Sequence, residues 1–379
     1  MSRKLRMGMV GGGPGAFIGP VHKMAAELDG RIELVAGAFS QSAARSHAAG
    51  ASFGIDAARA YSDYRAMFDV ESQRADGIDF VVIATPNHLH LPVAEAALAR
   101  GIAVMSDKPA TATYDEVLTL QGAVAKSGLP YGLTHTYAGY SLVREARALC
   151  GSGSLGPIRK VAVEYLQGWL SKPLEATGQK QAAWRSDPAL NGPGGCIGDI
   201  GTHAFHLVEY VTGLKVTSMN AALRTVVPGR RLDDDCNALL RLEQGASGTL
   251  MASQVAAGEG NGLRLRVYGE NGSLDWKQED PNRLHVKWLD GPEETRHAAA
   301  GYLSADARAV TRLPGGHPEG YIEAFAVLYR EFADTLKTWR SGEANALPAT
   351  LPGIEAGVRG MRFIERAIAS NKAQSWVDF

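Results

Sequence analysis

The sequence predicts two domains: an N-terminal α/β domain with a doubly wound parallel sheet, and a C-terminal α+β domain with a large, mostly antiparallel, open-faced sheet. Three observations predict this fold class. The chain has 379 residues, more than one small core usually contains. Short apolar segments alternate with helical patterns in the first third of the chain, and turn-separated strand patterns dominate afterwards. We therefore expect one domain over residues 1–135 and another over residues 136–379.

The first domain shows the strand–helix alternation that is typical of parallel sheets. Strand patterns cover residues 5–10, 31–39, 80–84, 102–105 and 131–133, and helical patterns cover residues 40–49, 90–100 and 114–126. The run Phe-Val-Val-Ile-Ala at 80–84 is apolar throughout, as in a strand that is covered on both faces. Helices are therefore expected on both sides of this sheet.

The second domain has a different order of secondary-structure patterns. Helical patterns cover residues 141–150 and 198–211, and strand patterns cover residues 215–227, 237–242, 248–254, 264–268 and 284–289. Two long helical patterns, 319–339 and 351–373, end the chain, and residues 291–316 show no regular pattern. Successive strands with few helices between them predict an antiparallel sheet with one uncovered face, so we expect a homodimer or homotetramer.

Composition excludes several classes of function. The formal net charge is −1, which does not favour binding to nucleic acid or to an anionic membrane. No apolar run approaches the ~20 residues of a spanning helix, and the basic N-terminus lacks the apolar stretch of a signal peptide. Three widely spaced cysteines predict neither a disulfide framework nor a zinc site, so a reducing cytoplasm is the expected location.

A glycine-rich turn follows the first strand, with the sequence Gly-Gly-Gly-Pro-Gly-Ala-Phe-Ile-Gly at 11–19. A dinucleotide-binding turn needs one glycine for the tight turn, one for close approach to the pyrophosphate, and a small third residue for helix–strand packing. Gly11 and Gly13 fit the first two roles. Ala16 has the usual spacing for the third, but Gly19 is the next glycine, so either residue is a candidate. A Rossmann-type nucleotide site is the prediction.

The end of the second strand indicates which nicotinamide cofactor binds. Sites that prefer NAD usually have Asp or Glu there, to bind the ribose 2′-hydroxyl. This chain has no acid at positions 38–45, and Ser40 and Arg45 are suitable donors to a 2′-phosphate. The pattern slightly favours NADP over NAD. The alternative is that Arg45 is only a solvated helix residue.

Polar residues follow two further strands at the edge where open α/β sheets bind ligands. Thr85, Pro86, Asn87 and His90 lie in the segment Thr-Pro-Asn-His-Leu-His after the strand at 80–84, and we expect them along the cofactor. For His90, and for its neighbour His88, the ordinary alternative is helix-start capping in solvent. Lys108 follows the next strand and is expected to reach the same place. Its ordinary alternative is a solvated lysine.

The segment Gly-Asp-Ile-Gly-Thr-His at 198–203 opens a helix in the second domain. Asp199 and His203 are four residues apart and so share one helix face. A carboxylate orients a hydroxyl or an imidazole, and an imidazole accepts a proton near neutral pH. Asp199 as a simple helix N-terminal residue is one alternative. A metal site with His206 is another, but it lacks a fourth ligand, so no metal is predicted.

Together these segments resemble one family. The glycine-rich turn and the segments at 85–90, 107–109 and 198–203 are similar, in order and spacing, to the Gfo/Idh/MocA oxidoreductases. That family includes inositol dehydrogenase, levoglucosan dehydrogenase and 1,5-anhydrofructose reductase. Segments at 165–169, 267–273 and 375–377 fit as well, so the resemblance covers nearly the whole chain.

The resemblance implies roles for three residues. Lys108 matches the catalytic lysine of the family's Glu-Lys-Pro, with Asp107 in place of the glutamate, and Asp199 and His203 match its Asp-x-x-x-His pair. Two hints about the cofactor disagree. The Ser40–Arg45 run resembles the NADP-preferring 1,5-anhydrofructose reductase branch. The segment at 165–169 resembles the levoglucosan dehydrogenase branch, which tends to use NAD.

The predicted function is hydride transfer between a nicotinamide and a hydroxyl or keto carbon of a sugar, anhydrosugar or cyclic polyol. In this hypothesis His203 accepts the hydroxyl proton, Lys108 donates a hydrogen bond to the developing alkoxide, and Asp199 orients the substrate or His203. Aromatic and polar side chains suit the faces and edges of such a substrate. The weaker candidates for its wall, each equally compatible with core or surface, are Tyr137, Gln167, Trp169, Trp184, Arg185 and His317.

Two other functions are compatible with the same motifs. One is an NAD-dependent glycosidase of the same fold, which oxidises a sugar hydroxyl only transiently. The other is a non-catalytic regulator that senses dinucleotide or sugar. A sensor has no need of Lys108, Asp199 and His203 together, and their joint presence favours the enzyme.

Overall fold

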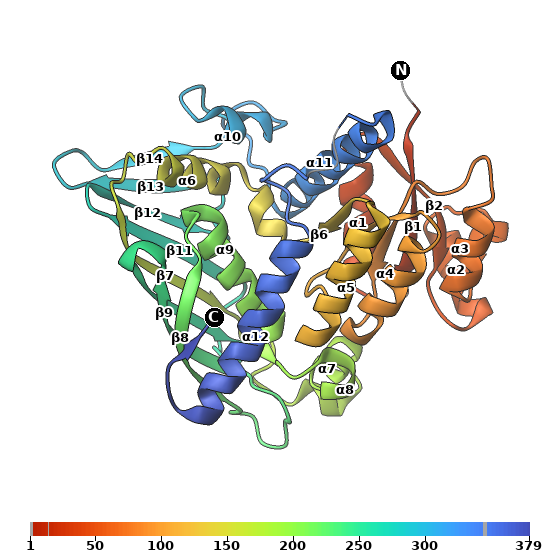
Figure 1. Cartoon of the computed structure of the whole chain (residues 1–379), viewed down its shortest axis with the longest axis horizontal. Helices are drawn as coiled ribbons and strands as arrows, with labels where there is room; N and C mark the ends of the chain where they lie inside the picture. Colours follow the sequence, from red (N-terminus) through yellow and green to blue (C-terminus); the bar gives the residue numbers. More distant parts are fainter. Residues whose placement is uncertain (1–2, 14, 344–346) are drawn as a thin grey trace. The chain divides into compact units, whose positions relative to one another are not determined.

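The computed structural model of the chain describes residues 3–13, 15–343 and 347–379 (Figure 1). By its internal contacts the chain divides into two compact units, Met1–His135 with Phe325–Arg359, and Thr136–Ala324 with Gly360–Phe379. The division after residue 135 is where the sequence pattern changes. The segment Phe325–Arg359 differs from the prediction, because its contacts group it with the first unit.

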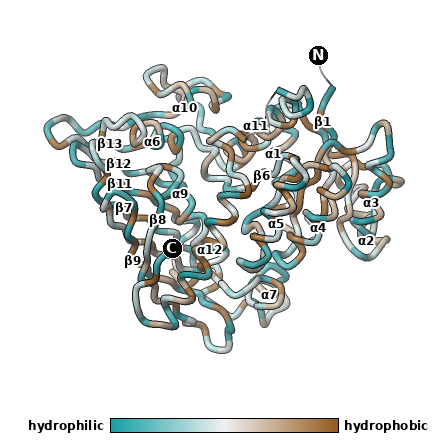
Figure 2. The backbone as a smooth tube through the Cα atoms, viewed as in Figure 1, coloured by the Kyte–Doolittle hydropathy of each residue, from teal (hydrophilic) through white to brown (hydrophobic). Residues whose placement is uncertain are grey.

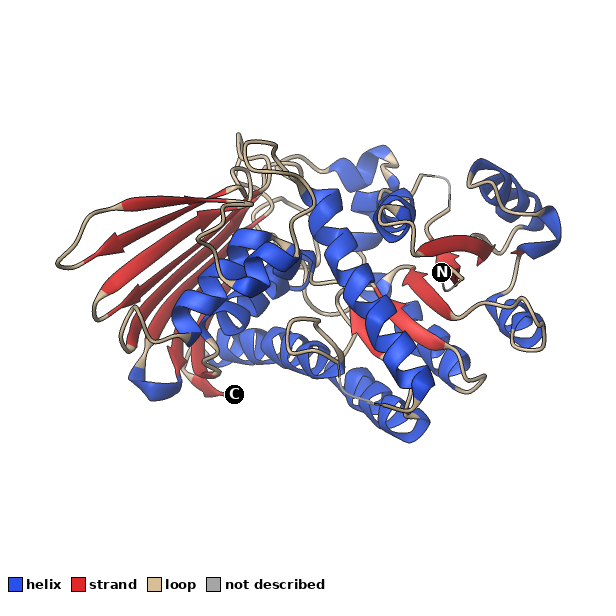
Figure 3. Cartoon of the chain, turned by 90° about the horizontal axis from the view of Figure 1, so that it is seen from above, coloured by secondary structure: helices blue, strands red, loops and turns tan. Residues whose placement is uncertain are grey.

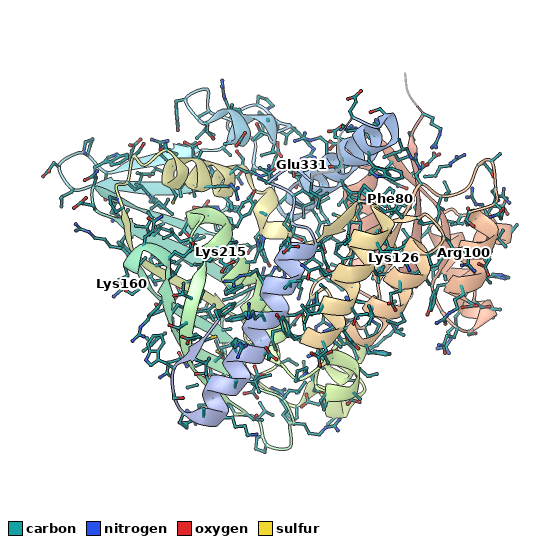
Figure 4. All side chains as sticks on the ribbon, viewed as in Figure 1. Phe80, Arg100, Lys126, Lys160, Lys215 and Glu331 are labelled. Atoms are coloured by element: carbon teal, nitrogen blue, oxygen red, sulfur yellow. The ribbon has the colours of Figure 1, made fainter. Side chains whose placement is uncertain are left out.

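The helix that begins this segment explains the difference. Helix α11 (Tyr321–Ser341) brings Phe325 to 4.9 Å from the ring of His22, and Phe332 to 5.2 Å from the ring of Phe80, measured between ring centroids. Phe80 begins the third of the predicted strands and lies in the interior of the first unit (Figure 4). A helix that follows the second domain in sequence therefore completes the core of the first.

The first unit contains a six-stranded parallel sheet with the strand order β3-β2-β1-β4-β5-β6. Its strands are β1 (Leu5–Gly11), β2 (Ile32–Ala38), β3 (Ala60–Tyr61), β4 (Phe80–Ala84), β5 (Ala103–Ser106) and β6 (Tyr131–Leu133). The connecting helices are α1 (Ile18–Glu27), α2 (Ala43–Ser52), α3 (Tyr64–Glu71), α4 (His90–Leu98) and α5 (Tyr114–Ser127). The predicted doubly wound sheet is confirmed.

The strand order reverses between β1 and β4, the central strands of this sheet. All five residues of β4 are buried, as the apolar run predicts for a strand covered on both faces. Strand β3 and helix α3 were not predicted. The Asp63 side chain nevertheless caps α3 by accepting hydrogen bonds from the amides of Arg65 and Ala66, a signal that local sequence contains.

The second unit contains a nine-stranded sheet with the order β14-β13-β12-β11-β7-β10-β9-β8-β15. Only β7 and β10 pair in parallel, so the sheet is mostly antiparallel, as predicted. Its strands are β7 (Ile158–Leu166), β8 (Val216–Arg224), β9 (Asp235–Leu242), β10 (Ser247–Ser253), β11 (Gly262–Gly269), β12 (Gly272–Lys277), β13 (Arg283–Trp288), β14 (Glu294–His297) and β15 (Val377–Asp378).

Helices lie along one face of this sheet, and they include α6 (Ser141–Gly151) and α9 (Thr202–Thr212) (Figure 3). The remaining helices described after residue 135 are α7 (Lys180–Arg185), α8 (Pro188–Asn191), α10 (Ala305–Ala309) and α12 (Ile354–Ala373). Strand β9 shows the consequence, because Ala238 and Leu240 are buried whereas Leu239 is exposed. Hydrophobic and hydrophilic residues are interspersed along most strands of this sheet (Figure 2).

Two predictions about this unit need correction. Residues 291–316, predicted to be irregular, contain β14 and α10. The helix predicted over residues 198–211 is not uniform: residues Ile197–Gly201 form a π-helical turn, and α9 follows it. Gly198 and Gly201 are poor α-helix formers, and π turns often mark functional sites.

In the part of the chain that the structure describes, no helix has the length and apolarity to cross a membrane.

Candidate active site

The glycine-rich turn brings the end of β1 against the end of β4. Gly11 has a φ of +84°, and a Cβ there would lie 2.5 Å from the carbonyl oxygen of Ala84. The amide of Gly12 donates a hydrogen bond of 3.1 Å to that same oxygen. Glycine is therefore required at position 11 by both conformation and space.

The structure distinguishes the two candidates for the third small residue. Gly19 lies in the first turn of α1, and a Cβ there would lie 2.1 Å from the carbonyl oxygen of Gly12. Ala16 lies in the preceding turn, where its amide donates to the carbonyl oxygen of Gly13 at 3.0 Å. Helix α1 thus approaches the strand end through Gly19, and the turn is three residues longer than the usual spacing.

The residues after β2 lie next to this turn. Gly13 faces the backbone of Phe39, where a Cβ on the glycine would lie 2.6 Å from the carbonyl oxygen. Ser40 follows, and its hydroxyl accepts a hydrogen bond from the amide of Ser42 at 3.2 Å. Arg45 is exposed on α2 and has no hydrogen bond or ion pair with the described residues. Ser40 therefore follows a residue whose backbone contacts the turn, and Arg45 is accessible on α2.

His90, at the start of α4, is not the exposed capping residue that the ordinary alternative describes. Only 1% of its surface is accessible. Its Nδ1 lies 2.7 Å from the carbonyl oxygen of Pro109, and its Nε2 lies 3.0 Å from the carbonyl oxygen of Thr85. Burial lowers the pKa of His90. Asn87 is also buried, and Pro86 lies half-buried beside it.

Lys108 is half-buried just after β5, on a loop that its neighbour holds in place. The Asp107 carboxylate accepts hydrogen bonds from the amide of Lys108 at 2.9 Å and from the hydroxyl of Thr134 at 2.8 Å. The peptide bond between Lys108 and Pro109 is cis, which the sequence left open. Asp107 therefore binds the backbone of the loop.

In the second unit, Asp199 lies in the π-helical turn and forms two charge-assisted hydrogen bonds. Its Oδ2 accepts from Nε of Arg185 at 3.1 Å and from Nε2 of Gln254 at 2.8 Å. His203, on the second residue of α9, is 8% exposed. Its ring lies edge-on to the ring of Tyr137, with 4.8 Å between centroids.

A hydrogen-bonded set of side chains extends from Tyr137; we call it the hydroxyl–amide array. The hydroxyls of Tyr137 and Tyr165 bond to one another, and Tyr165 donates to Oδ1 of Asn261 at 2.7 Å. Gln167 donates to the same Oδ1 at 2.7 Å, and Trp169 donates to Gln167 at 3.0 Å. Burial raises the pKa of Tyr137 and of Tyr165, so both are neutral hydroxyls that exchange hydrogen bonds.

The weaker substrate candidates separate into groups. Tyr137, Gln167 and Trp169 belong to the hydroxyl–amide array. Arg185 bonds Asp199 and lies over the ring of Trp184, 4.3 Å from its centroid. His317 is exposed, and its Nδ1 lies 3.2 Å from the carbonyl oxygen of Pro314, so its contacts within the described residues place it in neither group.

Sequence reasoning missed three members of these groups: Tyr165, Asn261 and Gln254. Tyr165 is at a buried position of β7 and was visible as an aromatic residue in the alternating pattern. Asn261 precedes β11, and Gln254 follows β10. Nothing in their local sequence separates these amides from ordinary turn residues.

The chemistry of the two sets is complementary. The first unit contains a glycine turn, a helix N-terminus and a lysine at the carboxyl edge of a parallel sheet, which is where such sheets bind nucleotides. The second contains a carboxylate, a histidine and neutral hydroxyls, which suit proton transfer and the binding of hydroxyl groups. Among the described residues, no three His, Cys, Asp or Glu side chains are grouped so as to hold a metal ion.

Comparison with known proteins agrees with this chemistry. Residues 5–135 match the model of an oxidoreductase family with an NAD-binding Rossmann fold. The protein is therefore a member of an oxidoreductase family with an NAD-binding Rossmann fold. Residues 143–275 match the GFO/IDH/MocA C-terminal domain, and the chain belongs to the Gfo/Idh/MocA family. The resemblance drawn from the motifs is confirmed.

Three relatives cover nearly the whole chain. The oxidoreductase YfiI of Bacillus subtilis is 34% identical over 100% of this chain and 98% of its own. The levoglucosan dehydrogenase of Pseudarthrobacter phenanthrenivorans is 26% identical over 99% and 98% of the two chains. The crystal structure of an inositol dehydrogenase homologue from Azotobacter vinelandii, with NADH and myo-inositol, is 37% identical over 100% and 98%, with a TM-score of 0.93.

Proposed function

We propose that this protein is an NAD(P)-dependent dehydrogenase that oxidises a hydroxyl group of a sugar, anhydrosugar or cyclic polyol, or reduces the corresponding ketone. The observation that carries the proposal is that Asp199 and His203 stand four residues apart in one helical segment. Arg185 and Gln254 bind the Asp199 carboxylate, and His203 is buried beside the hydroxyl–amide array. The names of two relatives, a levoglucosan dehydrogenase and an inositol dehydrogenase homologue complexed with myo-inositol, support the same class of substrate.

The first unit has the residues that would hold the cofactor. Gly11, Gly12 and Gly19 leave no room for side chains where the turn meets α1. In the described structure no side chain caps α1 at Phe17, so its first amides are suited to bind the pyrophosphate. Thr85, Pro86 and Asn87 follow β4 at the same edge of the sheet. When bound, the nicotinamide accepts or returns the hydride.

The side chains of the chain itself perform the proton chemistry. In the oxidation direction His203 accepts the hydroxyl proton as the C–H bond breaks, and in reduction it returns that proton. Lys108 donates a hydrogen bond to the substrate oxygen as negative charge develops there. Asp199 accepts a hydrogen bond from the substrate or from His203, and Arg185 and Gln254 fix its carboxylate for that role.

Replacement of Lys108 tests this assignment. Lys108→Ala should lower turnover by about 10²–10⁴-fold, because a group that stabilises the transition state is removed, and should leave the dissociation constant of the cofactor nearly unchanged. The measurement is formation of reduced cofactor by absorbance, with inositols, aldoses and anhydrosugars as substrates. Lys126→Ala, an exposed lysine on α5, is the matched control. Near-normal turnover of Lys108→Ala would refute the role of Lys108.

Cofactor preference is a second part of the proposal. We propose that Ser40 and Arg45 select between the two dinucleotides, because no carboxylate stands after β2 to repel a 2′-phosphate. NADP+ should then give the higher kcat/KM, and Arg45→Ala should lower that value for NADP+ alone. A wild-type preference for NAD+ that Arg45→Ala does not alter would contradict this part.

The same assay separates the other functions. A glycosidase that oxidises its substrate only transiently would release sugar from a glycoside without net reduction of cofactor. A sensor would bind cofactor or sugar and turn over neither the polyol panel nor a glycoside panel. Either result would refute the proposed dehydrogenase.

We also propose a homodimer or homotetramer in which a second copy covers the open face of the nine-stranded sheet. This face exposes Leu239, Met251 and Tyr268, with accessible fractions of 51%, 37% and 38%. A one-sided sheet with large apolar residues on its outer face is typical of a subunit interface. Light scattering after chromatography should show an oligomer that Leu239→Lys weakens. The cytoplasmic location expected from the cysteines stays a prediction.

A further inference from the structure

We propose that His90 is a positioning residue: it joins the loop after β4 to the loop of Lys108 and so fixes where the lysine stands, without itself binding the cofactor. This inference rests on the proposed function, in which Lys108 acts on the substrate oxygen. It also replaces the expectation that His90 lies along the cofactor. The contacts of the buried imidazole carry it.

Both nitrogens of the His90 ring face backbone carbonyls from different loops. Nδ1 lies 2.7 Å from the oxygen of Pro109, in the loop after β5, and Nε2 lies 3.0 Å from the oxygen of Thr85, in the loop after β4. The ring is 1% exposed, so water does not compete for these contacts. We call this arrangement the His90 bridge.

The two contacts of the bridge are not equivalent. A neutral imidazole donates through one nitrogen only, and burial lowers the pKa of His90 and so favours the neutral ring. The shorter distance, 2.7 Å, is the one to Pro109, so we place the N–H on Nδ1. The Nδ1–Pro109 contact is then the hydrogen bond of the bridge, whereas the unprotonated Nε2 only packs against the Thr85 oxygen. Pro109 is the residue next to Lys108.

Through the His90 bridge, a short series of contacts connects the loop of Lys108 to the glycine-rich turn. Thr85 follows Ala84, whose carbonyl oxygen accepts the amide of Gly12. On the other side, Asp107 accepts the amide of Lys108. A shift of the Pro109 carbonyl would therefore move Lys108 relative to the nucleotide-binding turn, and a displacement of about 1 Å at a reacting group can cost 10²-fold in rate.

Two conservative variants separate the two halves of the bridge. In His90→Asn the side-chain amide nitrogen takes the place of Nδ1, and in His90→Gln it takes the place of Nε2. His90→Asn should keep kcat within about tenfold of the wild type, and His90→Gln should lose about 10²-fold, because only the former keeps a donor to Pro109. The dissociation constant of the reduced cofactor, measured by its fluorescence, should change less than threefold in both.

The matched control is His22→Gln, the same substitution at another fully buried histidine of the first unit. Nδ1 of His22 lies 2.6 Å from the hydroxyl of Tyr329, and within the described residues His22 forms no hydrogen bond with either loop. It should lower the melting temperature and leave kcat within about twofold, because overall stability and loop position are separate properties.

The outcomes distinguish this inference from the function on which it rests. A wild-type protein without turnover on polyols or sugars would refute the proposed function. An active wild type with equal kcat losses in His90→Asn and His90→Gln, or with a large loss of cofactor affinity in both, would overturn the positioning role. If His90→Gln does not fold, the Asn variant decides: a kcat loss above about 10²-fold with intact cofactor binding would overturn the Pro109 contact.

Discussion

The two units hold their reactive side chains by different means. In the first, Lys108 is fixed through backbone groups: its amide is bound by Asp107, and the next carbonyl contacts His90. In the second, Asp199 is fixed through other side chains, Arg185 and Gln254. The difference follows from where the residues lie. Lys108 lies on a loop at the carboxyl edge of the parallel sheet, where neighbouring loops meet. Asp199 lies in the π-helical turn, and its partners come from α7 and from the end of β10.

The two sheets also bury their residues differently. Strand β4 is buried on both faces, and β9 is buried on one face only. A substitution in β4 therefore disturbs packing on both faces of the first sheet. In a single chain, a substitution on the outer face of the second sheet disturbs little packing. Three predictions test this contrast, in order of expected effect.

The largest expected effect is at the two carboxylates. Asp199→Asn should lower kcat/KM by about 10²–10³-fold, because it removes the charge that pairs with Arg185 and accepts from the reacting groups. Asp107→Asn keeps an oxygen that can accept from the Lys108 amide and should lower kcat/KM less than about tenfold. Steady-state kinetics of both variants provides the measurement. Equal losses would show that the contrast between backbone and side-chain positioning is wrong.

The next effect is on stability. Ile83→Ala in β4, where the residue is fully buried, should cost about 2–5 kcal/mol of unfolding free energy. Leu239→Ala in β9 should change it by less than about 0.5 kcal/mol in single chains, because the side chain lies on the outer face. Urea unfolding at high dilution measures both. A cost for Leu239→Ala equal to that of Ile83→Ala would contradict the one-sided burial of the second sheet.

The smallest expected effect is on the pH dependence of the unfolding free energy, through a buried histidine of the first unit. Burial lowers the pKa of His22 to about 4. The unfolded chain therefore binds a proton between about pH 6.5 and pH 4 that the folded chain excludes, and stability falls as pH decreases through this range. From pH 7 to pH 5 the loss from His22 is about 2 kcal/mol.

His22→Phe removes this contribution. The variant should lose about 2 kcal/mol less than the wild type between the two pH values, whatever its stability at pH 7. Other histidines, among them His206 with a pKa that desolvation lowers to about 3, titrate in both proteins and cancel in the difference. Identical pH dependence in the two proteins would show that His22 is not neutral and buried in the folded state.

Much of this protein is determined by the sequence alone, because its signals are local. The apolar run of β4 and the capping box of α5, formed by Thr113 and Glu116, set the positions of these elements without reference to distant residues. The succession of strand patterns with few helices between them indicated a one-sided sheet in the same way. Short contiguous segments were enough to identify the glycine turn, Lys108, Asp199 and His203 as motifs.

Only the tertiary structure decided which residues support them. His90 meets a carbonyl 19 positions away, Asp199 meets Gln254 across 55 positions, and His22 meets Tyr329 across 307. The choice of Gly19 over Ala16 depends on how closely α1 approaches the strand end, and the membership of α11 in the first unit depends on aromatic packing. Local sequence sets backbone conformation and burial pattern, but a hydrogen bond between distant residues exists only once the chain has folded.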